Sequence, residues 1–167
     1  YQKFVFHHAC EESGHELMAL HDVNSTLQTP LDIEKLPVPL VGTEALVGYL
    51  YWISLNGNPL ARLGYSFWAE NCYQYINPLV GKMKEKLELK NSQLTFFVAH
   101  SDIDDEHAKE VKEMIEKYST TAEDWNAITD VAVKSLELTG RMLDDVWSEY
   151  VKFKTNPSES RYKNYLS

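Results

Sequence analysis

The sequence predicts an all-α protein, and three observations support this fold class. Apolar residues recur with the spacing of about 3.6 residues that buries one face of a helix. Capping and turn residues separate these segments, whereas no pair of segments shows the alternating pattern of paired strands. The 167 residues are 44% hydrophobic, which is enough to bury a sizeable core. We therefore expect one helical domain over residues 1–155 and a polar tail over 156–167.

The first half of the chain predicts two helices. The first is expected over residues 2–23, where the apolar residues keep a helical period. Residues 24–39 contain three prolines and no clear period, which is typical of a long loop. Thr43 is expected to cap a second helix that ends at Leu55. The sequence Asn-Gly-Asn-Pro at 56–59 then predicts a turn.

The second half predicts three further helices. The third is expected over 60–87, with a kink at Pro78 because proline cannot donate the backbone hydrogen bond. The fourth is expected over 92–118, with Ser92 as its cap. Thr121 and Asp124 have the spacing of a capping box, so they predict the start of a fifth helix that runs to about Phe153.

Composition excludes several classes of partner. The net charge is −9 and no stripe of Lys and Arg is present, so we expect no nucleic-acid partner. No apolar run approaches the roughly 20 residues of a membrane span, and the start lacks the zones of a signal peptide. We expect a cytoplasmic protein with no membrane partner. Because the chain opens with Tyr1 in a segment with a helical pattern, we expect a preceding segment to be missing.

The most informative motif is His100, Asp104 and His107. At about 100° per residue the three side chains fall within about 60° of one another on a helical wheel, on its apolar side. Burying two imidazoles and a carboxylate costs several kcal/mol unless each is paired or bound to a cation. A shared metal ion is the simplest partner for all three.

Other predicted helices offer matching ligands. Glu11 and Glu12 precede His15 by about one helical turn, and His8 lies about one turn further back. Glu70 stands among aromatic and apolar residues, where an unpaired carboxylate is costly. Three carboxylates and three histidines are enough for two metal ions between facing helices. The candidate ligands are Glu12, His15, Glu70, His100, Asp104 and His107, with Glu11 and His8 as open alternatives to Glu12.

The ligand types favour iron. Imidazole and carboxylate suit non-haem Fe(II), with Mn and Zn as competitors, and the two cysteines form no cluster for structural zinc. Tyr73, about one turn after Glu70, is the expected hydrogen-bond donor beside the metal ligands. A redox role follows from an iron site.

Three motifs together resemble the haem-oxygenase-like diiron oxidases, a family that includes CADD-like and UndA-like proteins. They are Glu11-Glu12-Ser13-Gly14-His15, then Glu70, then His100-Ser101-Asp102-Ile103-Asp104-Asp105-Glu106-His107. The resemblance covers about residues 1–150 and implies a haem-oxygenase-like bundle of about seven helices whose N-terminal helix or helices are missing here. It also implies that the six candidate residues bind two Fe, or Mn and Fe.

The resemblance implies an enzyme with dioxygen as co-substrate that oxidises a small organic molecule, a fatty acid or an amino acid being the favoured classes. Members differ in whether the first carboxylate lies three, four or seven residues before the histidine, and in this chain the seventh position is His8. Two alternatives stay open: a metal-independent thiaminase-like or pyrroloquinoline-quinone-synthesis-like enzyme, and a CADD-like interaction module with a vestigial metal site. A homodimer through residues 48–52 is also open.

Overall fold

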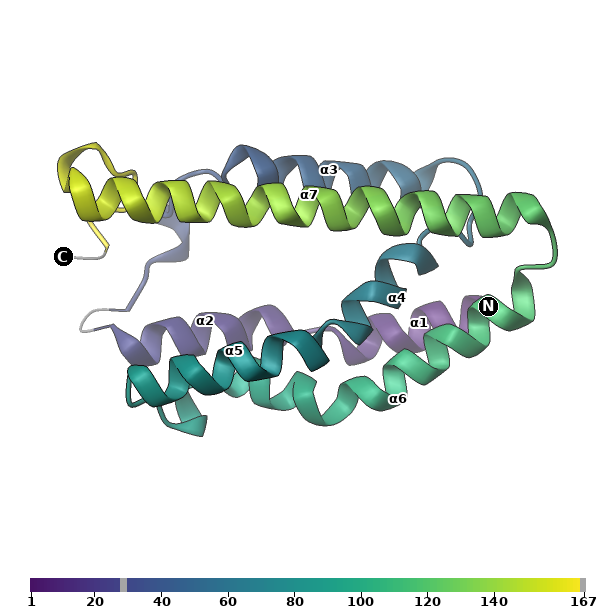
Figure 1. Cartoon of the computed structure of the whole chain (residues 1–167), viewed down its shortest axis with the longest axis horizontal. Helices are drawn as coiled ribbons and strands as arrows, with labels where there is room; N and C mark the ends of the chain where they lie inside the picture. Colours follow the sequence, from purple (N-terminus) through teal and green to yellow (C-terminus); the bar gives the residue numbers. More distant parts are fainter. Residues whose placement is uncertain (28–29, 166–167) are drawn as a thin grey trace. The chain divides into compact units, whose positions relative to one another are not determined.

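We describe the chain from a computed structural model, shown in Figure 1. The described part comprises residues 1–27 and 30–165, without the side chains of 101–105. In this part the regular structure is helical, and no strand is present. The α-helices are α1 (Gln2–Glu11), α2 (His15–Thr26), α3 (Val41–Leu55), α4 (Leu63–Asn71), α5 (Tyr73–Lys86), α6 (Thr95–Tyr118) and α7 (Ala122–Thr155), and three short 3-10 helices are η1 (Ile33–Lys35), η2 (Asn91–Gln93) and η3 (Pro157–Glu159).

The helices divide into two compact units, each built from two stretches of chain. Unit 1 comprises Tyr1–Pro30 and Ser66–Thr120, and unit 2 comprises Leu31–Tyr65 and Thr121–Ser167. None of the described helices combines the length and the apolar character that a membrane crossing needs. The expected boundary at residue 155, between a helical domain and a polar tail, stays a prediction.

The first predicted helix is in fact two helices, α1 and α2, which meet at a turn over residues 12–14. Gly14 has a φ of +99°, which only glycine adopts without strain, and this residue is the N-cap of α2. The prediction of one continuous helix over 2–23 is therefore wrong. The apolar period of the sequence does not mark this break, and α1 buries none of its residues.

A second break separates α4 from α5. The kink was expected at Pro78, but Pro78 lies inside α5 and the chain turns at Cys72 instead. There the Cys72 backbone N–H and thiol both donate to the carbonyl of Ala69, at 3.4 and 3.0 Å, which tightens the end of α4. Glu70 thus lies in the last turn of a short helix.

Helix α6 is capped by a residue from another helix. Ser92 was expected as its cap, but Ser92 belongs to η2 and α6 begins at Thr95. The buried carboxylate of Asp22, on α2, accepts hydrogen bonds from the backbone N–H groups of Thr95 and Phe96 at 2.8 and 2.9 Å. It also accepts one from the Thr95 hydroxyl at 2.7 Å. Asp22 therefore fixes the start of α6, the helix that carries the candidate ligands His100, Asp104 and His107.

Unit 2 is organised around α3 and α7, which lie side by side (Figure 1). Helix α3 begins at Val41, two residues before the predicted cap Thr43. Gly42 allows close approach, because a Cβ there would lie 2.7 Å from the Met142 backbone nitrogen. The predicted capping box is confirmed: the Asp124 backbone N–H donates to the Thr121 hydroxyl, and the Asp124 carboxylate accepts from the Thr121 N–H.

The predicted polar tail is partly fixed against α7. Ser160 is only 2% exposed, and its hydroxyl donates to the Glu149 carboxylate at 2.9 Å. The same Glu149 oxygen accepts from the Arg161 backbone N–H at 2.8 Å. The tail has the expected polar composition. The Glu149 side chain of α7 nevertheless holds part of it at a buried position.

Candidate metal centre

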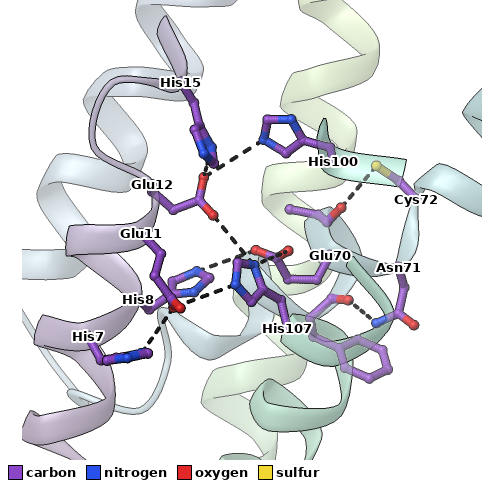
Figure 2. A network of polar contacts seen from close by, with 12 residues as sticks. His7, His8, Glu11, Glu12, His15, Glu70, Asn71, Cys72, His100 and His107 are labelled. Atoms are coloured by element: carbon purple, nitrogen blue, oxygen red, sulfur yellow. Dashed lines mark hydrogen bonds and ion pairs between the residues drawn. The ribbon is translucent and has the colours of Figure 1, made fainter. Parts of the chain in front are cut away.

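Histidine and glutamate side chains from four helices converge within unit 1, as Figure 2 shows. Helix α1 and the turn after it contribute His8, Glu11 and Glu12, and α2 begins with His15. Helix α4 contributes Glu70, and α6 contributes His100 and His107. Donor atoms of six of these residues form two groups that could each hold a metal ion, and one residue belongs to both. Glu11 falls in a third, more exposed group with His7 and Glu110.

Glu12 is the residue that the two groups share. Its Oε2 lies 2.9 Å from His15 Nδ1 and 3.9 Å from His100 Nε2. Its Oε1 lies 3.6 Å from His107 Nδ1. Each carboxylate oxygen therefore faces a different group, which is the arrangement in which one carboxylate can bridge two cations.

The first group consists of His8, Glu12, Glu70 and His107. One donor atom from each of the four residues lies within 4.8 Å of the others. The side chains of Glu70 and His107 are only 11% and 7% exposed, and Glu70 Oε2 lies 3.6 Å from His107 Nδ1. This separation is longer than a good hydrogen bond, so the pair is close without being directly bonded.

The second group consists of Glu12, His15 and His100. The Nδ1–H of His100 donates to the Phe96 carbonyl at 2.6 Å, which leaves the Nε2 lone pair directed toward Glu12. Such a bond from the other ring nitrogen fixes the tautomer of metal-binding histidines. The rings of Phe96 and Tyr73 pack on the His100 imidazole, with centroids at 4.2 and 5.5 Å. The predicted role of Tyr73 as a donor stays a prediction, although the residue does lie beside a candidate ligand.

The structure places the side chains of Glu11 and Glu12 differently, a choice that the sequence left open. Glu11 Oε2 lies 3.5 Å from Nε2 of His107, on the opposite side of the ring from Nδ1, which faces Glu12 and Glu70. It also pairs with His7 Nδ1 at 3.0 Å. Glu11 is thus placed behind the His107 ring, as the carboxylates that orient metal-binding histidines are.

His8 lies together with Glu12 and Glu70 and does not replace either of them. Its Nε2 is 3.4 Å from Glu70 Oε1. The hydrogen-bonding interaction with Glu70 raises the pKa of His8 above its ordinary value, while burial of the ring opposes the rise. In a metal-free protein His8 is therefore positioned to offset part of the charge of Glu70.

The structure brings together five of the six predicted ligands: Glu12, His15, Glu70, His100 and His107. The sixth, Asp104, has a side chain outside the described part, so its role stays a prediction. The sequence offered His8 only as an alternative to Glu12, from its place seven residues before His15. The structure places both residues in one group.

The residues present fit an iron ion. Imidazole and carboxylate ligands together suit divalent first-row metals such as Fe and Mn. Nδ1 of His8 is buried and has no hydrogen-bond partner in the described part, so a buried polar atom at this site lacks its partner. A cation among these groups would relieve the repulsion between the Glu12 and Glu70 carboxylates, which approach the same face of His107.

Comparison with known proteins identifies the family. A sequence profile of a family described as iron-containing redox enzymes matches residues 2–140. The chain belongs to this family. The match covers both groups of candidate ligands, and the description of the family as iron-containing agrees with a donor set that suits iron. No curated protein matches the chain.

A solved structure of a similar protein supports the predicted fold of this chain. It is a domain of unknown function with a haem oxygenase-like fold from Shewanella denitrificans, 50% identical to this chain, with a TM-score of 0.85. The alignment covers 92% of this chain and 66% of that one, so the chain spans about two thirds of its relative. The predicted all-α, haem-oxygenase-like fold is confirmed, and so is the resemblance to haem-oxygenase-like iron proteins.

Proposed function

We propose that unit 1 binds two iron ions bridged by Glu12 and that the protein uses them to oxidise a small organic substrate with dioxygen. The observation that carries the proposal is the orientation of the Glu12 carboxylate, which presents one oxygen to each group of donors. Glu70 and His107 complete one group, and His15 and His100 the other. Asp104 is proposed as a further ligand from its place between His100 and His107 in the sequence.

Bound iron in the reduced state would supply the electrons that dioxygen needs to oxidise a substrate. The chain's own contribution is to hold the ligands in fixed orientations. The Phe96 carbonyl holds the His100 ring, and the Glu11 carboxylate lies behind the His107 ring. The aromatic rings of Phe96 and Tyr73 shield one ligand from water.

The favoured substrates are a fatty acid or an amino acid, because the haem-oxygenase-like diiron oxidases that the motifs resemble act on such molecules. Fold and metal set are shared more widely than substrate within such families. We therefore propose the reaction class, oxidation with dioxygen, separately from the substrate.

The test is anaerobic loading of the purified metal-free protein with Fe(II), followed by elemental analysis and rapid mixing with dioxygen. We expect about two Fe per chain, as two groups of donors that share Glu12 predict. On mixing with dioxygen we expect a transient visible absorption. Absence of tightly bound iron, or iron that does not respond to dioxygen, would contradict the proposal and favour the metal-independent enzyme or the interaction module.

Substitutions of single candidate ligands test whether these residues bind the iron. His100→Ala and His107→Ala should each remove iron and abolish the response to dioxygen, because each takes one of the two imidazoles from one group. His21→Ala is the matched control, since His21 is an exposed histidine in the same unit whose ring hydrogen-bonds to the Ser92 carbonyl, and it belongs to none of the donor groups among the described residues. Oxidation that survived both ligand substitutions would exclude the proposed centre.

A further inference from the structure

We propose that His8 is an additional ligand of the ion held by Glu12, Glu70 and His107, so that the two ions have unequal ligand sets. The inference deepens the proposed function and rests on it, because it assumes that unit 1 binds metal. It concerns the position seven residues before His15, which is one of three positions where members of the family that the motifs resemble have a carboxylate.

The first support is the distance between donor atoms. One donor from each of His8, Glu12, Glu70 and His107 lies within 4.8 Å of the others. Two ligands on opposite sides of an ion, each at about 2.1 Å, lie about 4.2 Å apart. Small side-chain rotations therefore suffice for all four residues to reach one ion.

The second support is the unsatisfied state of the His8 ring. Its side chain is only 17% exposed, and Nδ1 is buried without a partner among the described residues. The Nε2 contact with Glu70, at 3.4 Å, is longer than the usual hydrogen bond of about 2.7–3.2 Å. Nδ1 thus lacks a partner in the described part of the chain, and leaving a buried polar atom unpaired is costly. A metal ion would supply the missing partner.

The third support is that neighbouring rings fix the orientation of His8. The Phe4 ring stacks on it with centroids 5.6 Å apart and planes at 14°. The His107 ring meets it edge-on at 5.1 Å. These contacts hold the imidazole beside Glu70 before any ion binds, so little conformational entropy is lost on binding.

Unequal ligand sets predict stepwise binding. One site has two imidazoles and two carboxylates among the described residues, whereas the other has two imidazoles and the shared carboxylate. We expect the first ion to enter the site with His8, because it offers more donors. The Kd of this first step should depend on His8, and the second step should depend on it far less.

The experiment is anaerobic addition of Co(II) to the metal-free protein, followed by calorimetry and visible spectroscopy. Wild type should show two steps. His8→Ala should weaken the tighter step at least about tenfold and remove one metal-shifted imidazole resonance from the NMR spectrum of the Co(II) protein. His8→Gln keeps a group that donates to Glu70 but is a poor metal ligand, and it should resemble His8→Ala. His21→Ala should resemble wild type.

Three outcomes would overturn the proposal, and they are distinguishable. If His8→Ala binds Co(II) as wild type does, His8 is not a ligand although the centre exists. If His8→Gln restores the wild-type affinity, His8 only positions Glu70. If wild type itself binds no Co(II) and no Fe(II), the proposed function fails together with this inference.

Discussion

At the scale of single residues, Glu11 and Glu12 are adjacent and chemically identical, yet their surroundings differ. Glu12 faces three histidines of the two groups, and Glu11 faces the outer nitrogen of His107 and the exposed His7. Metal affinity should therefore respond differently to the same substitution at these two positions.

Glu12→Gln should lower the number of bound Fe(II) ions per chain by about half or more, because an amide oxygen cannot bridge two cations as a carboxylate does. Glu11→Gln should keep the full number of ions at saturation and weaken their binding by about tenfold, as loss of an orienting carboxylate does. Elemental analysis and anaerobic calorimetry measure both quantities. Equal loss of iron in the two variants would show that Glu11 is itself a ligand.

At the scale of helices, the start of α6 depends on Asp22. Asp22→Ala removes three hydrogen bonds to a buried carboxylate and should lower the free energy of unfolding by about 3 kcal/mol. It should also weaken metal binding, because the Phe96 carbonyl that holds His100 lies in the first turn of α6. Urea denaturation and Fe(II) binding are the measurements.

Thr121→Ala is the control for Asp22, since it removes a cap of α7 that lies in unit 2. This substitution should lower the free energy of unfolding by about 1 kcal/mol and leave metal affinity unchanged. A loss of metal affinity in Thr121→Ala equal to that in Asp22→Ala would contradict a specific link between the α6 cap and the metal centre.

Stability and metal binding should also respond to a substitution in the turn between α1 and α2. Gly14→Ala forces a residue with a Cβ to adopt a φ of +99° and should cost about 1–2 kcal/mol of stability. No atom lies within 4 Å of the added Cβ, so the cost comes from the backbone alone. The same substitution should weaken metal binding, because the turn sets the distance between Glu12 and His15.

Gly81→Ala is the matched control for Gly14→Ala. Gly81 lies inside α5 with open space around its Cβ position, so alanine should stabilise the helix by up to about 1 kcal/mol. Thermal unfolding of the two variants gives opposite shifts in Tm if this reasoning holds. A stabilising effect of alanine at position 14 would show that the turn does not require its positive φ.

At the scale of the whole molecule, the two units should respond to different variables. Unit 1 contains all the described candidate ligands, so metal should affect its stability. In unit 2 the pKa of Glu149 lies below its usual value, chiefly because the carboxylate accepts the Arg161 backbone N–H, with Lys152 and Ser160 adding to the effect. The stability of unit 2 should therefore depend on pH.

The depressed pKa sets the direction of this dependence. The unfolded chain binds a proton at Glu149 more readily than the folded one, so its contribution is full above the ordinary pKa of 4.5 and is lost as pH falls through the lower folded value. Hydrogen exchange should show protection of residues 160–162 at pH 7 that declines below pH of about 4. In Glu149→Gln the protection of these residues should be weak both at pH 7 and at the lower pH. Protection equal to that of wild type would contradict the role of Glu149.

Much of the fold was readable from local patterns. The period of apolar residues predicted the helices, and the Thr121–Asp124 capping box predicted the start of α7, because both signals arise within one or two turns of chain. The breaks at Gly14 and Cys72 and the cap of α6 by Asp22 were not predicted. They depend on hydrogen bonds and backbone angles that a helical period does not record.

The sequence by itself determined the fold class and most of the candidate ligands, because residue type and helical spacing are local properties. The tertiary structure decided what spacing alone left open: Glu12 faces both groups of donors, Glu11 lies behind His107, and His8 lies with Glu70. Residues on α1 and α6 are about ninety positions apart in the chain, and only the packing of helices fixes which of their atoms meet.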